Sequence, residues 1–319
     1  MGFDRNVEII RGIENIQNIE GPSAVTIGVF DGVHLGHQTI IKMAVDFARI
    51  IHGVSVVVTF EPHPLAIVRP ESQPPLLTAT DLKAEYIREL GANHLLVIPF
   101  SLEFANMAAE DFIDNVLLDK LHAQYVVVGE DFSFGKGRRG NVAFMDSYGG
   151  PKGLKAIGVP HIKTDDIVIS STEVRERLKR GDILGAHELT GRYPRFRGKV
   201  VHGFGRGGSV IGVPTANVET LYGELLPSAG VYAGYAWVDD DREPCVIDIG
   251  WSPTFGDLLK PEIHVHILGF KKDIYGKRID IELIDKLRDE KTFNTIDELK
   301  QQIQRDIQKA KEALASKSK

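Results

Sequence analysis

The sequence predicts an α/β domain built on a parallel sheet, followed by an antiparallel β-barrel or sandwich and a C-terminal helix. Up to about residue 187, apolar strand-like runs alternate with helical runs, the pattern of a parallel sheet covered by helices on both faces. Beyond that point, short alternating segments are separated by turns rich in Gly, Asp and Pro. The 319 residues leave room for two domains, which we expect at residues 1–187 and 188–319.

The strands of the first domain are expected where apolar residues run together between turn signals. They are Ala24–Val29, Val54–Phe60, His94–Pro99, Tyr125–Val128 and His161–Lys163. The helices are expected where apolar residues recur at helical spacing. They are Gln38–Ile51, Ala79–Leu90, Ala108–Lys120 and Thr172–Arg180. Because ligands of such sheets bind beyond the carboxyl ends of the strands, we expect functional residues in the loops that follow them.

The second domain is expected to contain short strands of alternating polarity. They are Arg195–Val201, Gly230–Val238, Pro244–Ile249, Glu262–Leu268 and Arg278–Leu283. A final run from Ile296 to about Leu314 has apolar residues in helical phase. It predicts one amphipathic helix after the last strand.

Composition restricts the class of protein. With 43% hydrophobic and 26% charged residues, the chain resembles ordinary soluble proteins, and a net charge of −6 argues against a general nucleic-acid binder. No apolar run approaches a membrane span, the first residues lack the apolar stretch of a signal peptide, and Cys245 is the sole cysteine. We therefore expect a cytoplasmic protein, a monomer or weak homo-oligomer, with small-molecule ligands and neither nucleic-acid nor membrane partners.

One stretch carries chemistry at the first strand-to-helix junction, Thr26-Ile-Gly-Val-Phe-Asp-Gly-Val-His-Leu-Gly-His37. Gly32 and Gly36 allow the backbone to turn tightly, which places His34 and His37 at or just before a helix N-terminus. Helix N-termini favour anions, so the stretch indicates a phosphate site, with a plain surface turn as the alternative. A metal site is disfavoured because no cysteine or carboxylate cluster lies nearby at ligand spacing.

Three further stretches follow expected strands or precede an expected helix. Thr59-Phe-Glu-Pro-His-Pro64 and Val128-Gly-Glu-Asp-Phe-Ser-Phe-Gly135 follow strands, and a basic loop, Lys136–Gly140, comes after the second of them. Ile169-Ser-Ser-Thr-Glu-Val-Arg175 precedes a helix, where Ser171-Thr172 has the form of an N-cap. A cap leaves the remaining N–H groups available, so it is compatible with a phosphate site.

Together these motifs resemble the bacterial FAD synthetases, a branch of the nucleotidyltransferases with a Rossmann-like fold. The resemblance implies that the phosphate of FMN attacks the α-phosphorus of ATP. His34 and His37 would stabilise the α-phosphate transition state, and Arg175 the leaving pyrophosphate. Ser171 and Thr172, with Arg175, would hold the β- and γ-phosphates, and Mg²⁺ would bridge phosphate oxygens. The resemblance also implies nucleotide contacts by Gly28, Phe30, Asp31 and Gly36, and flavin contacts by His63, Asp131 and Phe132.

A glycine-rich segment follows the first expected strand of the second domain, Gly203-Phe-Gly-Arg-Gly-Gly-Ser-Val-Ile-Gly-Val-Pro-Thr-Ala-Asn217. It is compatible with a hairpin or with a phosphate cradle, and it lacks the Gly-Lys-Ser/Thr ending of a Walker loop. At its end, Thr215 and Asn217 project to one side of an extended chain. They can therefore offer oxygen ligands to a hard cation, with a plain turn as the alternative.

Pro214-Thr-Ala-Asn217 resembles the motif of riboflavin kinases. Other matching segments are Gly230–Gly234, Asp248–Gly256, Asp273–Gly276 and Leu287–Phe293. Over nearly the whole chain, the resemblance is to the bifunctional riboflavin kinase/FAD synthetases, whose kinase domain is an antiparallel barrel. It implies that riboflavin is converted to FMN and FMN to FAD, each with ATP. It also implies phosphate contacts by Gly203, Gly205, Arg206 and Ser209, a flavin contact by Arg288, and Mg²⁺ at Thr215 and Asn217.

The sequence departs from the family at the kinase base. The family uses a carboxylate on a strand, and counting back from Tyr275 places His264 there. Glu262 lies two residues earlier on the same strand face. Either Glu262 or a largely neutral His264 is the base, or the kinase half is weakened. The alternative function is therefore FMN adenylyl transfer alone, with a barrel that only binds flavin.

Overall fold

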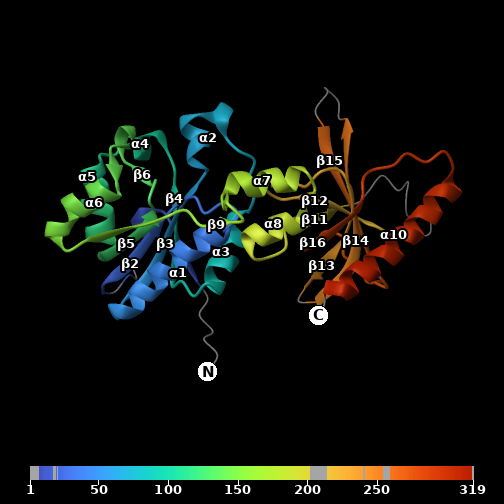
Figure 1. Ribbon diagram of the computed structural model, residues 1–319, viewed down its shortest axis with the longest axis horizontal. Helices are drawn as coiled ribbons and strands as arrows, with labels where there is room; N and C mark the ends of the chain where they lie inside the picture. The colour runs from blue at the N-terminus through green and yellow to red at the C-terminus, as the bar shows by residue number, and fades with distance from the viewer. Residues whose placement is uncertain are drawn as a thin grey trace. The chain divides into compact units, whose positions relative to one another are not determined.

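The computed structural model describes residues 7–16, 19, 21–201, 214–239, 241–253 and 259–317 (Figure 1). The chain divides into two compact units. The first comprises Met1–Pro75 and Thr80–Ser170, and the second comprises Leu76–Ala79 and Ser171–Lys319.

The described part of the first unit contains a parallel sheet. Its strands, in spatial order, are β1 (Glu8–Arg11), β4 (His94–Pro99), β3 (Val54–Glu61), β2 (Ser23–Ile27), β5 (Ala123–Gly129) and β8 (Lys155–Val159). The chain runs from β2 outward to β3 and β4, then returns to the other side of β2 with β5. Strand order reverses between β2 and β5, and ligands of such sheets bind beyond the strand ends at that point.

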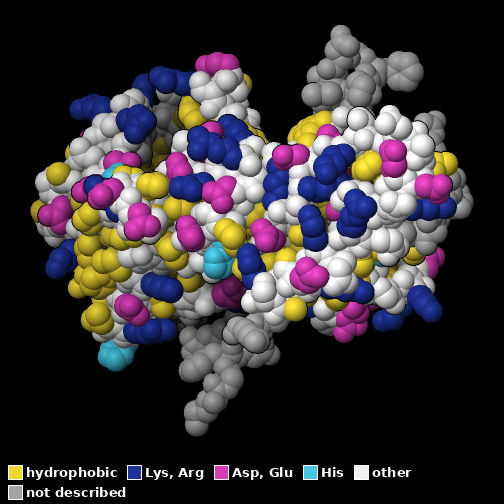
Figure 2. Space-filling model, turned by 45° about the vertical axis from the view of Figure 1, so that its right-hand side comes forward, with side chains coloured by type: hydrophobic (Ala, Val, Ile, Leu, Met, Phe, Trp, Pro, Cys, Tyr) yellow, Lys and Arg dark blue, Asp and Glu magenta, His cyan; other side chains and the backbone are white. Residues whose placement is uncertain are grey.

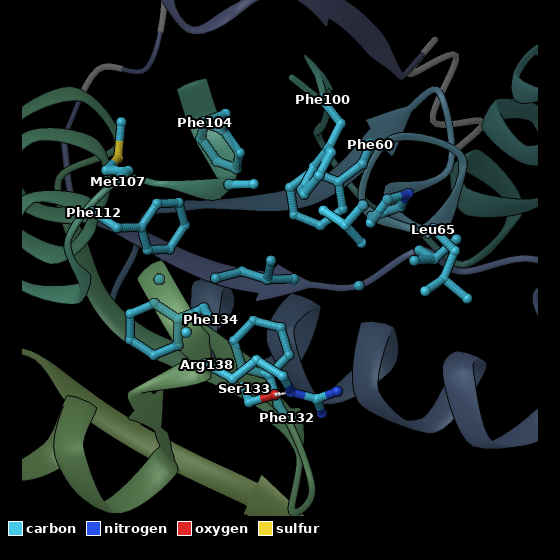
Figure 3. Close-up of a pocket in the computed structure, with 18 of the residues that line it drawn as sticks. Phe60, Leu65, Phe100, Phe104, Met107, Phe112, Phe132, Ser133, Phe134 and Arg138 are labelled. Carbon is cyan, nitrogen blue, oxygen red and sulfur yellow. Dashed lines mark hydrogen bonds between the residues drawn. The ribbon is translucent and has the colours of Figure 1, made fainter. Parts of the chain in front are cut away.

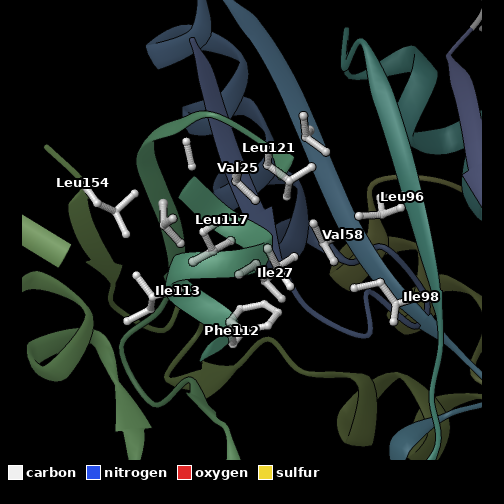
Figure 4. Close-up of a cluster of buried hydrophobic side chains, with 14 of the residues drawn as sticks. Val25, Ile27, Val58, Leu96, Ile98, Phe112, Ile113, Leu117, Leu121 and Leu154 are labelled. Carbon is white, nitrogen blue, oxygen red and sulfur yellow. The ribbon is translucent and has the colours of Figure 1, made fainter. Parts of the chain in front are cut away.

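Helices cover both faces of this sheet. They are α1 (Leu35–Ile50), α2 (Pro64–Val68), α3 (Thr80–Glu89), α4 (Leu102–Ala105), α5 (Ala109–Asp111), the π-helical segment η3 (Phe112–Lys120) and α6 (Val142–Gly149). On one face, Phe112, Ile113 and Leu117 of η3 pack toward the apolar side chains of β2, β3 and β4 (Figure 4). On the other face, Ile41 of α1 and Leu82 of α3 belong to a second apolar cluster. The parallel α/β prediction is therefore confirmed.

One strand prediction for this unit is wrong. The expected strand at His161–Lys163 is absent, and the edge of the sheet is instead β8 (Lys155–Val159). Of the expected segment, only Lys163 is extended, in a small hairpin formed by β9 (Lys163–Thr164) and β10 (Ile167–Val168). An edge strand is exposed along one side, so β8 lacks the continuous apolar run that marks a buried parallel strand.

In the second unit, α7 (Ser171–Lys179) and α8 (Ile183–Thr190) precede a closed antiparallel barrel. Its strands, in spatial order, are β11 (Arg195–Val201), β12 (Ala216–Thr220), β15 (Leu259–Ile267), β14 (Asp241–Pro253), β13 (Gly230–Val238) and β16 (Arg278–Arg288). This confirms a barrel rather than a sandwich. Strand β12 escaped prediction because its sequence, Ala-Asn-Val-Glu-Thr, offers a single large apolar residue.

The C-terminal helix, α10 (Ile296–Lys317), lies along the outside of the barrel (Figure 1). Its residues Ala310 and Leu314 pack on Ala233 of β13 and Ile284 of β16. Alternate residues of each strand face the barrel interior, so the other set is left to meet α10 or to line a site on the outer surface.

A buried carboxylate joins β11 to β16. Asp280 is 6% exposed. Arg197 donates two hydrogen bonds to it, of 2.6 and 2.8 Å, and Arg195 donates another. Burial alone would raise the pKa of Asp280, but the hydrogen bonds and charges of the two guanidinium groups lower it below the ordinary value. The carboxylate therefore stabilises the barrel above pH 3.8, and the stabilisation is lost as the pH falls through the lowered pKa.

Asp280→Asn is expected to lower the free energy of unfolding of the barrel by about 3 kcal/mol, because two largely buried arginines lose their counter-charge. Urea unfolding followed by tryptophan fluorescence measures the loss. Asp239→Asn is the matched control, since it removes an exposed partner of Lys277 and should change the stability by less than about 1 kcal/mol. Equal effects of the two substitutions would contradict the structural role of Asp280.

Candidate functional site

The loop after β2 is a strained turn held by two donors. Phe30 and Val33 have φ values of 51° and 39°, and Gly32 has a φ of 80°. The carbonyl of Val29 accepts hydrogen bonds from Lys83 Nζ at 2.8 Å and from the Thr59 hydroxyl at 2.9 Å. These bonds anchor the start of the turn, and with it the backbone that leads to the two histidines.

Lys83 is a residue that the sequence analysis missed. It is 3% exposed, and burial lowers its pKa against the opposing charges of Asp31 and Glu61. A detectable signal was present, because Lys83 stands on the same helical stripe as the buried Ile87. A lysine on a core-facing stripe indicates a specific polar partner.

His34 and His37 form a stacked pair at the N-terminus of α1. Their ring centroids are 3.6 Å apart, and the backbone N–H of His37 donates to His34 Nδ1 at 3.3 Å. A ring nitrogen that accepts a hydrogen bond carries no proton, so neutral His34 holds its proton on Nε2. His34 is therefore both the cap of α1 and a potential hydrogen-bond donor, beside the positive end of the helix dipole.

Gly36 makes room for this arrangement. A Cβ atom at this position would lie 3.1 Å from Cε1 of His34 and 3.7 Å from the carbonyl oxygen of Ile169. The segment that leads toward α7 therefore passes beside the start of α1. Ser171, Thr172 and Arg175 occupy the first turns of α7, which belongs to the second unit. Their approach to the histidines stays a prediction.

A cavity of about 630 Å³ opens beside the same turn. Figure 3 shows five phenylalanine rings arranged around it, Phe60, Phe104, Phe112, Phe134 and Phe132, and neighbours in this order form tilted, T-shaped, tilted and stacked pairs. At one side, Arg138 Nε donates to the Ser133 hydroxyl at 2.7 Å (Figure 3). The cavity is a predominantly aromatic slot with a few polar groups, which suits a flat heteroaromatic ligand.

The predicted flavin contacts of the first unit fall in different places. Asp131 and Phe132 line the aromatic cavity, as does Gly28, which was predicted to contact the nucleotide. His63 is not among its lining residues; it caps α2, with its Nδ1 accepting from the backbone N–H of Leu65 at 3.1 Å. Other aromatic walls, including Phe60 and Phe104, were missed. For Phe60 the signal was an aromatic residue at the carboxyl end of a parallel strand, β3, whereas Phe104 lies in α4, five residues beyond the end of β4.

The barrel carries a cavity of about 330 Å³ between its outer face and α10. Thr215, Asp248, His264 and Arg288 line it from the barrel, and Leu299, Ile303 and Ile307 line it from the helix. Thr215 also lines a second cavity, of about 250 Å³, together with Asp273 and Tyr275. Thr215 is therefore the point that the two cavities share.

A polar row crosses three strands, and two of its members, His264 and Asp248, line this cavity. His264 of β15 pairs in register with Asn217 of β12 and with Asp248 of β14. Burial raises the pKa of Asp248, while the positive charges of His264 and Arg288 act in the opposite direction. His266 Nδ1 lies 2.7 Å from the carbonyl oxygen of Pro214, and this contact fixes the residue before Thr215. Asp248 and His266 were missed as site residues because cross-strand neighbours depend on register.

Two predicted kinase residues differ in their access to the cavity. Glu262 is absent from the cavity lining, and its side chain is 47% exposed. Its Oε2 lies 3.8 Å from Nε2 of His264, which does line the cavity. Arg288 also lines it and is held by Asp306 of α10, with Nη2 to Oδ2 at 2.8 Å. The predicted phosphate contacts Gly203, Gly205, Arg206 and Ser209 lie outside the described residues.

Thr215, at the shared point, and Asn217, which lies two residues further along and outside both cavity linings, fit a Mg²⁺ ion that is bound mostly by substrate. Thr215 and Asn217 supply a hydroxyl and a carboxamide oxygen. Within the part of the chain that the structure describes, no group of three or more His, Cys, Asp or Glu residues could hold a metal by itself. Mg²⁺ commonly takes few protein ligands and completes its shell with phosphate oxygens and water. The residues present therefore fit such an ion.

A histidine-capped helix at the switch point of a parallel sheet, joined to a barrel with two adjoining cavities, defines a two-part nucleotide-dependent transferase. The family model for FAD synthetase matches residues 16–173, and that for riboflavin kinase matches residues 190–314. The chain belongs to the family of bifunctional riboflavin kinase/FMN adenylyltransferases. The relative from Buchnera aphidicola (Acyrthosiphon pisum) is 36% identical over 94% of this chain and 96% of its own.

Two further comparisons also extend over nearly the full length of the chain. The bifunctional riboflavin kinase/FMN adenylyltransferase of Escherichia coli K12 is 35% identical, covering 96% of this chain and 97% of its own. A crystal structure described as a macrolide-efflux protein from Streptococcus pneumoniae superposes with a TM-score of 0.84 at 27% identity, covering 96% of this chain and 99% of that one. No helix formed by the described residues has the length and hydrophobicity that crossing a membrane requires.

Proposed function

We propose that this chain phosphorylates riboflavin to FMN with ATP and then adenylylates FMN with a second ATP, giving FAD and pyrophosphate. The observation that carries the proposal is that one chain matches both family models. The alternative, adenylyl transfer alone, is not favoured, because the relatives are bifunctional over nearly the full length of the chain. We place the division of activities at 187/188, between the end of one match and the start of the other.

In adenylyl transfer, a phosphate oxygen of FMN attacks the α-phosphorus of ATP, and the bond to the α,β-bridging oxygen breaks as pyrophosphate leaves. Little covalent work falls to the protein, so positioning and charge stabilisation account for the catalysis. We assign His34 Nε2–H and His37 to the α-phosphate and Arg175 to the leaving pyrophosphate. Ser171 and Thr172 hold its oxygens at the start of α7.

The aromatic cavity of the first unit is the proposed site for the isoalloxazine ring of FMN. Phe132 and its neighbouring rings offer faces and edges for stacking, and each aromatic pair is worth about 0.5–1.5 kcal/mol beyond area burial. Gly28 lines this cavity and lies in the loop that leads to His34. A flavin in the cavity would therefore be close to the phosphate site, as adenylyl transfer requires.

In the barrel, we propose that riboflavin occupies the cavity against α10 and that ATP approaches from the second cavity. Because Thr215 lines both, its position is the proposed place of phosphoryl transfer. His264 is the proposed proton acceptor for the 5′-hydroxyl, in preference to Glu262, which does not line the cavity. Arg288 is proposed to contact the flavin. Mg²⁺ held by Thr215 and Asn217 would neutralise phosphate charge there.

The experiment that tests the proposal is a product assay. Purified chain is incubated with riboflavin, ATP and MgCl₂, and flavins are separated by chromatography. FMN should appear first and FAD should follow. FAD formation from added FMN without any FMN formation from riboflavin would establish the adenylyltransferase alone, and formation of neither product would contradict the proposal.

The ligands are proposed to be small molecules only. Acidic and basic side chains are interspersed on the face shown in Figure 2, and the net charge is −6, which disfavours a general polyanion-binding surface. We propose a cytoplasmic monomer or weak homo-oligomer. Size-exclusion chromatography at several protein concentrations measures the oligomeric state.

A further inference from the structure

Lys83 of α3 is a buried lysine that acts from behind the wall of the aromatic cavity. Its side chain is 3% exposed, and Lys83 is absent from the cavity lining, to which Val29 belongs. Among the described residues, both hydrogen-bond partners of its Nζ are neutral: the Val29 carbonyl at 2.8 Å and the Thr59 hydroxyl at 3.4 Å. Lysine is almost never fully buried unless it is paired. A buried ammonium on neutral partners therefore calls for a reason other than a direct ion pair.

Two donors converge on the carbonyl of Val29. The Thr59 hydroxyl, which is fully buried, donates to it at 2.9 Å, beside the bond from Lys83. A carbonyl oxygen has two lone pairs, so it accepts both bonds at once. The carbonyl is thereby fixed from β3 by Thr59 and from α3 by Lys83.

The turn that follows Val29 is strained and depends on being held. Phe30 and Val33 adopt positive φ values of 51° and 39°, and both side chains are buried. A β-branched residue at positive φ is an outlier that persists only where the surrounding structure imposes it. At the end of the turn, Gln38 Nε2 donates to the Val33 carbonyl at 3.0 Å. His34 follows directly, so the anchors at the two ends of the turn set the position of its imidazole.

The charge of Lys83 is also drawn toward this turn. Burial lowers the pKa of Lys83, and the negative charges of Asp31 and Glu61 act in the opposite direction. Asp31 belongs to the turn and is itself 2% exposed. The ammonium is therefore linked to the turn in two ways, by a hydrogen bond to the carbonyl before it and by attraction to a carboxylate within it.

We propose that Lys83 is a positioning residue for adenylyl transfer: its ammonium fixes the carbonyl of Val29 and so holds the strained turn that presents His34 to the α-phosphate. The inference rests on the proposed adenylyltransferase function. Lys83 takes no part in bond making or breaking and touches neither substrate. Its effect on the reaction passes through the backbone from Val29 to His34.

The first test is steady-state FAD formation from FMN and ATP by full-length K83M, which keeps an unbranched side chain and removes the ammonium. Its kcat should fall by about tenfold or more, because small misplacements of groups that stabilise a transition state are costly in rate. The KM for FMN should stay within about twofold, since the aromatic walls of the cavity are unchanged. FMN formation from riboflavin should be unaltered, because its proposed residues lie in the second unit.

Amide hydrogen exchange followed by mass spectrometry separates positioning from folding. Protection of α1 and α3 should be the same in K83M as in the unaltered chain, because Thr59 still donates to the Val29 carbonyl and leaves it satisfied. K42M, at an exposed lysine of α1, is the matched control and should change neither kcat nor protection. Loss of protection in K83M, in step with the loss of FAD formation, would show that Lys83 serves only the stability of the fold.

Thr59 supplies the second test, because it shares the acceptor with Lys83. T59S keeps the hydroxyl and should leave kcat within about twofold, whereas T59V should lower it by about threefold. Combining K83M with T59V removes both donors, so the loss should exceed the product of the two single losses. Unchanged kcat in K83M, a raised KM at unchanged kcat, or equal losses in T59S and T59V would each overturn the assignment. Absence of FAD formation by the unaltered chain would instead contradict the adenylyltransferase function itself.

Discussion

Removing either imidazole of the stacked pair should lower FAD formation from FMN and ATP by about 10²-fold or more, while riboflavin phosphorylation continues. The reason is that His34 and His37 are proposed to donate to the α-phosphate as negative charge accumulates there. Such donors act in a preorganised site, so a mutated site cannot recover the loss by rearranging water. Chromatographic assay of FAD from FMN, beside FMN from riboflavin, measures both activities in one protein.

Capping and catalysis by His34 can be separated by the choice of substitution. Asparagine is a strong N-cap, so His34→Asn keeps an acceptor for the N–H of His37 but removes the donor at Nε2. It should preserve the stability of α1 and still lose adenylyl transfer. His52→Asn, two residues beyond the C-terminal end of the same helix, is the control, because asparagine tolerates the positive φ of 53° at that position. Full FAD synthesis by His34→Asn would show that His34 only caps the helix.

Thr215→Val and Asn217→Leu should each lower FMN formation by about tenfold or more and raise the Mg²⁺ concentration needed for half-maximal rate. Both substitutions remove an oxygen while roughly keeping volume, the first at the point shared by the two cavities of the barrel and the second two residues further along the chain. FAD formation from FMN should be unchanged, since its proposed residues lie elsewhere.

The matched control for this pair is Thr220→Val, the same chemical change at the opposite end of β12. It should leave the Mg²⁺ dependence of FMN formation unaltered. If Thr215→Val and Asn217→Leu titrate with Mg²⁺ as the unaltered chain does, the metal assignment is wrong and both side chains serve packing only.

Local patterns predicted those elements whose signal lies within a few neighbouring residues. The strand His94–Pro99 was predicted with its observed bounds, because a fully buried parallel strand is a continuous apolar run. The final helix was predicted from its apolar spacing. The edge strand β8 and the short strand β12 were not, because half-exposed strands owe their pairing to neighbours distant in sequence.

The two candidate sites of the first unit differ in the same respect: one is formed by neighbouring residues of the chain, and the other by residues far apart in it. The histidine turn was evident because a strand, glycines, two histidines and a helix follow one another directly along the chain. The aromatic cavity was not, since its walls come from the ends of β3, β4 and β5 and meet only when the parallel sheet forms. Lys83 escaped for a related reason, because its partner Val29 lies on another element.

The surroundings of the candidate kinase base also depend on the tertiary structure. Sequence spacing placed His264 where the family has a carboxylate and left Glu262 as an alternative two residues away. Only the barrel put Asp248 beside His264, because register across β14 and β15 joins residues 16 positions apart in the chain. Contiguous motifs specify which chemistry the chain carries, whereas strand pairing decides which charged groups lie beside the candidate residues.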